Sequence, residues 1–132
     1  MANEAVLVVK KSDPIDFTIL NTTAVEKGAI CNMYSPRSTS GSSVVPGDEF
    51  GGINFREKIA SDGTTSVALF RDGVFRCKVA TGGTVTVGQH VTMSGANLIR
   101  TATEAEIAAG SSIGIALETK TGDLGCEVAV GE

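Results

Sequence analysis

The side chains that could carry out chemistry are few in this sequence, and they lie far apart. His90 is the only histidine, and the three cysteines, Cys31, Cys77 and Cys126, form no CxxC pair. A structural zinc site needs four nitrogen or sulfur ligands, so all four of these residues would have to converge. Each cysteine lies in an apolar, strand-like stretch, where a free thiol behaves as a small hydrophobic side chain. We therefore predict no metal site and no cofactor.

Two pairs of carboxylates could in principle act as general acid and base. Asp48 and Glu49 fall in a Ser/Gly/Pro-rich stretch, and Glu104 and Glu106 fall at the start of a short helical pattern. Catalytic carboxylates need a rigid, desolvated cleft that separates their pKa values. GxxxxGK[ST], GxGxxG and GxSxG motifs are also absent from the sequence. The chain is therefore predicted not to be an enzyme.

Composition excludes further classes. The formal net charge is −4, with 11 Lys plus Arg against 15 Asp plus Glu, and the charges are interspersed. A nucleic-acid-binding protein would show a basic stripe, so direct binding of nucleic acid is not expected. No apolar stretch approaches 18 residues, and Lys10 and Lys11 follow the first apolar run where a signal peptide would have positive charges before it. We expect no membrane partner and synthesis inside the cell.

The elements that must position these residues are short β-strands. Asp62-Gly63 and Asp72-Gly73 are turn sequences, and the second predicts a β-hairpin over Val67–Phe75. One helix is predicted at Thr103–Ala109, capped by Thr103. The pattern predicts an all-β fold, a small barrel or sandwich with one short helix. The expected strands are Ala5–Lys10, Phe17–Asn21, Gly28–Tyr34, Gly52–Ala60, Thr65–Arg71, Val74–Ala80, His90–Met93, Leu98–Thr101, Ser112–Lys120 and Glu127–Val130.

The two halves of the sequence resemble each other. Three segments repeat in the same order, which favours a duplicated β-unit with two copies around one core. The matches are Gly28–Met33 with Gly88–Met93 at an offset of 60, Gly52–Lys58 with Gly114–Lys120 at 62, and Val67–Leu69 with Val128–Val130 at 61.

We expect two regions: an N-terminal arm or edge strand over residues 1–20 and a single β domain over residues 21–132. Within the domain, residues 35–49 are rich in Ser, Gly and Pro and are expected to form an exposed loop, either a mobile surface loop or one that orders on a partner. Edge strands offer unpaired backbone groups and can dock by strand addition. The residues expected to contact a partner are Ala5, Val6, Leu7, Val8, Val9, Lys10 and Pro14.

Five short segments follow one another along the chain: Val25–Ile30, Phe50–Ile53, Asp72–Phe75, Val87–Val91 and Ile113–Glu118. Their order resembles the capsid cement, or head decoration, proteins of tailed viruses (phages). The resemblance covers roughly residues 20–131, and no single segment is specific. It implies a β-rich protein, often a homotrimer, that binds the major capsid protein on the outer surface of an icosahedral virion. Synthesis would be in the host cytoplasm, and binding at subunit junctions would stabilise the shell.

The main alternative is a non-catalytic β-module that binds a carbohydrate or a receptor on the virion. Such a module would expose aromatic rings for stacking on sugars. Only Tyr34 and Phe50 are candidates, and the sequence has no Trp. A hydrolase or nucleic-acid enzyme would need a convergent polar cluster, which the spacing does not indicate. The resemblance to capsid cement proteins agrees better with an acidic, turn-rich chain that lacks catalytic motifs.

Overall fold

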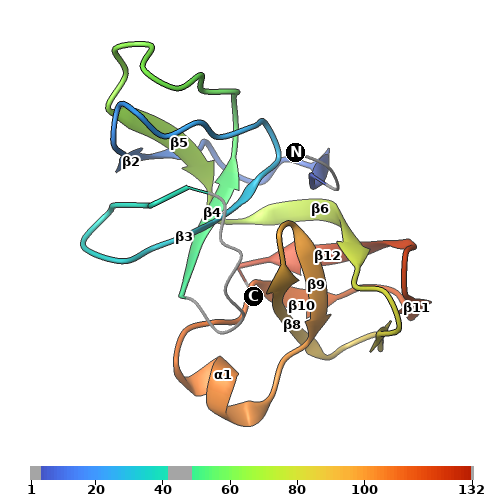
Figure 1. Ribbon diagram of the computed structural model, residues 1–132. Coiled ribbons are helices and arrows are strands. Elements are labelled where there is room, and N and C mark those ends of the chain that lie inside the picture. The colour runs from blue at the N-terminus through green and yellow to red at the C-terminus, as the bar shows by residue number, and fades with distance from the viewer. Residues whose placement is uncertain (1–3, 42–48, 132) are drawn as a thin grey trace.

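The computed structural model describes residues 4–41 and 49–131 of the chain. Those residues form β-strands and one short helix, which confirms the predicted all-β fold (Figure 1). The elements are β1 (Val6–Val9), β2 (Ile15–Thr18), β3 (Ile30–Asn32), β4 (Phe50–Asn54), β5 (Ser66–Phe70), β6 (Gly73–Val79), β7 (Thr84–Val85), β8 (His90–Gly95), β9 (Leu98–Thr101), α1 (Glu104–Ala108), β10 (Gly114–Ala116), β11 (Lys120–Thr121) and β12 (Gly125–Val130).

Five strands of the second half close into a small barrel. Their order is β6-β12-β10-β8-β9, and β9 pairs back onto β6 in parallel through Lys78–Leu98 and Val79–Ile99. Every second residue of β6 and β12 is buried, as expected for strands with one face toward a core. We call residues 73–130 the second unit; the predicted small barrel is confirmed there.

The first unit, residues 15–70, carries an antiparallel sheet of order β2-β5-β4-β3. This is the order β6-β12-β10-β8 of the second unit, strand for strand. The register also repeats: Ile30 pairs with Ile53 in the first unit, and His90 pairs with Ile115 in the second. The first two matches of the sequence echo therefore occupy equivalent positions in the fold.

The pairing that closes the barrel of the second unit also has an equivalent in the first unit, where it consists of isolated β-bridges. Ser38 pairs in parallel with Thr18, as Leu98 pairs with Lys78, again at an offset of 60. Ser38 also pairs antiparallel with Ser35, as Leu98 does with Gly95. The first unit is thus a less regular version of the barrel.

The third match of the echo is wrong by two residues. Ile53 pairs with Phe70, whereas its counterpart Ile115 pairs with Ala129, so β5 and β12 correspond at an offset of 59 and not 61. A two-residue shift keeps each side chain on the same face of a strand, so the hydrophobic pattern alone cannot detect it.

The buried hydrophobic residues form two clusters, which differs from the single core that the echo suggested. Phe17, Ile19, Val25 and Leu69 belong to the cluster of the first unit. The larger cluster fills the barrel and also includes Ile30, Phe50, Ile53 and Phe70 from the first unit. Strand β4 is buried along its whole length, since it lies between the two units.

The hairpin predicted over Val67–Phe75 is wrong. Strand β5 pairs with β2 and β4, whereas β6 pairs with β1, β12 and β9. Asp72-Gly73 turns the chain as its sequence indicates, and Gly73 has a φ of +120°. The turn connects the two units and not two strands of one sheet, because both strands have other partners.

The expected exposed loop over residues 35–49 is only partly correct. Thr39 is 1% exposed, and its hydroxyl donates to Asn32 Oδ1 at 3.0 Å. The main chain of Thr39 also donates to Thr18 O at 2.9 Å. Residues 35–41 are thus tied to the first unit by the hydrogen bonds that close its ring, while residues 42–48 of the expected loop lie outside the described residues.

Helix α1 begins at the predicted cap. Thr103 and Glu106 form a capping box, in which each side chain accepts from the backbone N–H of the other residue. Glu106 also binds Arg100 of β9 through two hydrogen bonds of 2.9 and 2.5 Å. None of the helix residues is buried, so this ion pair is a principal contact between the helix and the barrel.

Replacing Gly114 by Ala should destabilise the fold. A Cβ atom there would lie 2.1 Å from the carbonyl oxygen of Ala129, so β10 and β12 would have to separate. We expect a loss of about 2–4 kcal/mol in urea unfolding. Gly63→Ala is the control: its Cβ would meet no atom within 4 Å, and its φ of +87° should cost about 1–2 kcal/mol. Equal losses would contradict the steric argument.

Replacing Glu106 by Gln should change the acid stability of the protein. The hydrogen bonds from Arg100, together with those from Thr103, lower the pKa of Glu106 from 4.5 to about 2. The stabilisation is therefore complete above pH 4.5 and is lost as the pH falls from 4.5 through 2. The variant should be less stable than the wild type by about 1 kcal/mol at pH 7, and this difference should shrink toward pH 2. Thermal unfolding across pH 2–7 measures it; a constant difference would rule out this role.

Candidate interaction surface

Strand β1 exposes an unusual amount of apolar surface. The side chains of Val6, Leu7, Val8 and Val9 are 62%, 39%, 44% and 50% exposed, whereas Ala5 just before them is buried. The strand lies at the edge of the six-stranded sheet and pairs only with β6 among the described strands. Four consecutive exposed apolar residues on an edge strand are typical of a surface that another molecule covers.

The edge of β1 offers little room for strand addition. The register with β6 shifts between Leu7 and Val9, which places one extra residue in β1. A bulge of this kind bends the strand and interrupts its hydrogen-bonding edge. At the other end, Ala5 N–H already donates to Gly28 O at 2.8 Å. The arrangement favours contacts through the apolar side chains over a long strand-to-strand pairing.

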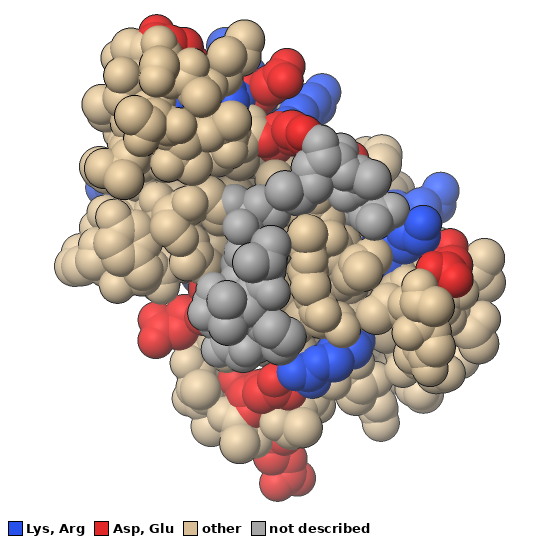
Figure 2. Space-filling view, viewed as in Figure 1, with Lys and Arg blue, Asp and Glu red and all other residues tan. Residues whose placement is uncertain are grey.

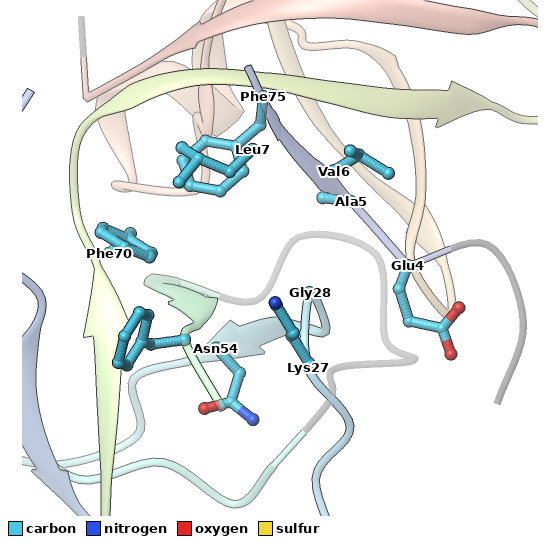
Figure 3. Close-up of a pocket in the computed structure, with 10 residues that line it drawn as sticks. Glu4, Ala5, Val6, Leu7, Lys27, Gly28, Asn54, Phe70 and Phe75 are labelled. Carbon is cyan, nitrogen blue, oxygen red and sulfur yellow. The ribbon is translucent and has the colours of Figure 1, made fainter. Parts of the chain in front are cut away.

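A hollow of about 550 Å³ lies beside β1, between the two units (Figure 3). Leu7 and Phe75 lie together on one side of it, and Phe70 lies across from them. The rings of Phe55, Phe70 and Phe75 form a series, with centroids 5.5 and 5.6 Å apart. Lys27 and Glu4 add one charge of each sign to the lining. The hollow could therefore accept an apolar side chain of a partner.

The other predicted contact residues lie farther along the chain. Lys10 is exposed and forms an ion pair with Asp13 at 3.0 Å. Pro14 is half-buried and lines a different hollow, of about 530 Å³. Ser12 donates to Asp72 at 2.6 Å and so ties this segment to the turn between the units. The structure thus exposes Val6–Lys10 together, leaves Ala5 buried and places Pro14 apart from them.

The residues considered for chemistry do not converge. His90 Nδ1 lies 2.8 Å from the hydroxyl of Ser112, and the structure gives this pair no carboxylate partner in the described part of the chain. Glu106 is engaged by Arg100, and Asp48 lies outside the described residues. Over residues 4–41 and 49–131, no group of three His, Cys, Asp or Glu residues could hold a metal ion.

Charged side chains of both signs are interspersed over the face shown in Figure 2, without a continuous basic area. This agrees with the pattern of the sequence. Helix α1 is the one helix in the described residues, and its five residues are too few to cross a bilayer.

Sequence reasoning missed several exposed apolar side chains outside β1. Leu20, Ile59, Val87, Leu117 and Leu124 are between 44% and 67% exposed. Their segments read as ordinary strand ends and turns, so hydrophobic pattern gave no reason to place them outside.

These features define a class: an all-β module that exposes apolar side chains on an edge strand and, over the residues described, does not bring the candidate catalytic groups together. Comparison with known families matches residues 9–131 to the family described as phage cement protein. The match covers nearly the whole chain, and the protein belongs to this family. A search of the curated proteins found no match. The family is structural, which implies a non-enzymatic protein that associates with the phage capsid and is located on the virion.

The buried thiols should be unreactive in the native protein. Burial raises the pKa of Cys31 and of Cys77 to about 12, so almost no thiolate is present at pH 8. Alkylation at pH 8, followed by mass spectrometry, should label these residues at least about a hundredfold more slowly than in urea. Rapid labelling of Cys77 in the native state would show that the barrel opens readily.

Proposed function

We propose that this protein binds the outside of the phage head at the junctions between capsid subunits and stabilises the shell against internal pressure. The match to the phage cement protein family over residues 9–131 carries this proposal. Its partner is the major capsid protein, and it joins the head after synthesis in the host cytoplasm. Catalysis plays no part in such a role, which needs only a stable module with a complementary surface.

The surface that we assign to the capsid contact is β1 with its neighbours: Ala5, Val6, Leu7, Val8, Val9, Lys10 and Pro14. Burying an exposed apolar side chain stabilises a complex by roughly 25 cal/mol per Å² of apolar area. The exposed fractions of β1 support this assignment, since they leave such area available. The bulge at β1 favours a capsid loop that drapes over these side chains rather than one that extends the sheet.

We further propose that the protein acts as a homotrimer on the head. A symmetric oligomer presents the same weak contact several times, and each contact after the first is effectively intramolecular. Avidity then exceeds the single-site affinity by about 10²–10⁴. Such multivalent binding suits a shell whose subunits repeat around each junction.

The carbohydrate-binding alternative loses one of its two candidate aromatic residues. Phe50 is 5% exposed and belongs to the core, so its ring cannot stack on a sugar. Tyr34 is 60% exposed and remains. One exposed ring provides a poor platform for sugars.

Placing lysines on β1 should weaken head binding. Val6→Lys/Val8→Lys would put two charges on the exposed strand without altering the buried Ala5. We expect at least about tenfold weaker co-sedimentation with phage heads that lack the protein, because the charges would have to be desolvated. The control is Ile59→Lys, at an equally exposed apolar residue of the first unit. Failure of the wild type to bind heads would refute the proposed function; normal binding by the β1 variant would refute the assigned surface alone.

A further inference from the structure

Residues 4–6 cross the first unit at a glycine turn. Ala5 N–H donates to Gly28 O at 2.8 Å, and a Cβ on Gly28 would lie 2.3 Å from Ala5 O. Lys27 and Phe55 line the hollow beside this contact, and Figure 3 shows Lys27 next to Gly28. We call Lys27, Gly28 and Phe55 the Gly28 site; it holds an extended segment with a small residue over the glycine.

The second unit contains the counterpart of this site. Gly88 corresponds to Gly28 at an offset of 60, and its φ of +86° matches the +83° of Gly28. Its N–H donates to Ala116 O at 2.8 Å, as Gly28 N–H donates to Asn54 O at 2.9 Å. We call Val87, Gly88 and Leu117 the Gly88 site, in which Val87 takes the place of Lys27 and Leu117 that of Phe55.

Nothing in the described part of the chain covers the Gly88 site. A Cβ on Gly88 would meet no atom within 4 Å, and the described residues provide no donor to its carbonyl oxygen. Val87 is 56% exposed and Leu117 is 44% exposed. The second unit therefore presents the backbone geometry that holds residues 4–6 in the first unit, with a more apolar rim.

We propose that the Gly88 site binds an extended segment of the phage shell protein. The segment places a small residue over Gly88 and donates a backbone N–H to its carbonyl oxygen, as Ala5 does at Gly28. Apolar side chains of the segment pack on Val87 and Leu117, because Val87 offers no charge at the position that Lys27 occupies in the first unit, where Lys27 and Glu4 both line the hollow. This inference rests on the proposed function and adds a second capsid contact to the one at β1.

A second copy of the chain is a poor occupant. The segment that fits such a site, residues 4–6, is already bound at Gly28 of its own chain. Moving it to Gly88 of a neighbour would break one contact to form an equivalent one, and would also detach Ala5 from the core. A shell segment forms the contact without this loss.

The test compares two double variants in head binding. Val87→Lys/Leu117→Lys changes the Gly88 site, and Leu20→Lys/Ile59→Lys changes two apolar residues of the first unit that are more exposed. Each is checked by circular dichroism and thermal unfolding, then co-sedimented with phage heads that lack the protein. We expect at least about tenfold weaker binding for the first variant and wild-type binding for the second. Val87→Ser/Leu117→Ser, which adds no charge, replaces the first variant if that one does not fold.

The outcomes separate this inference from the proposed function. If the wild type does not bind heads, the proposed function fails, and the inference that rests on it fails too. If the wild type binds and the Gly88-site variant binds equally well, the inference alone fails. A photo-crosslinking residue at position 117 should capture the shell protein on heads. Capture of a second copy, or a change in oligomer mass of the free variant without a change in head binding, would overturn the assigned occupant.

Discussion

The fold depends on the burial of β4 on both faces. This strand borders the core of the first unit and contributes Phe50 and Ile53 to the cluster that fills the barrel. Such a strand needs close backbone contact: a Cβ on Gly51 would lie 2.3 Å from Asn32 O, and one on Gly52 would lie 2.7 Å from the Leu69 Cβ. Because glycine alone leaves that room, the neighbouring strands approach closely and the two units share one boundary. Buried Asn97 adds a polar contact there, since its Oδ1 accepts the N–H of Ile30 at 2.9 Å.

The two units have the same strand order, but the outer edges of β6 and β2 are covered in different ways. In the second unit, the outer edge of β6 is covered by β1, with Val6 opposite Arg76. The equivalent position in the first unit is Asp16, whose carbonyl oxygen accepts two hydrogen bonds from the Arg37 guanidinium, at 3.1 and 3.0 Å. The Arg37 side chain thus covers the edge of β2, whereas strand β1 covers the edge of β6. The glycine turns show the reverse asymmetry, because residues 4–6 cover Gly28 and leave Gly88 open.

This asymmetry leaves two distinct apolar surfaces exposed, and these are the surfaces that we propose as contacts with the shell. The apolar side chains of β1 lie beside the boundary between the units, and the Gly88 site lies on the barrel itself. Both surfaces lie against paired strands of the six-stranded sheet, since β1 pairs with β6, and β10, which ends just before Leu117, pairs with β8. A phage cement protein must hold its shape under load, so rigid strands are a suitable support for weak contacts repeated many times.

The sequence by itself determined the all-β class, the capped helix at Thr103 and the echo between the halves, because these follow from local spacing and turn chemistry. It also indicated an N-terminal arm or edge strand, while the exposure of Val6–Val9 became known only from the structure. Only the tertiary structure decided which strands pair. The residues Asp72-Gly73 indicate a turn, but they do not indicate that β6 belongs to a different sheet from β5. It also fixed the two-residue shift of β12 and the exposure of Val87 and Leu117, because strand partners and burial depend on contacts between residues far apart in the chain.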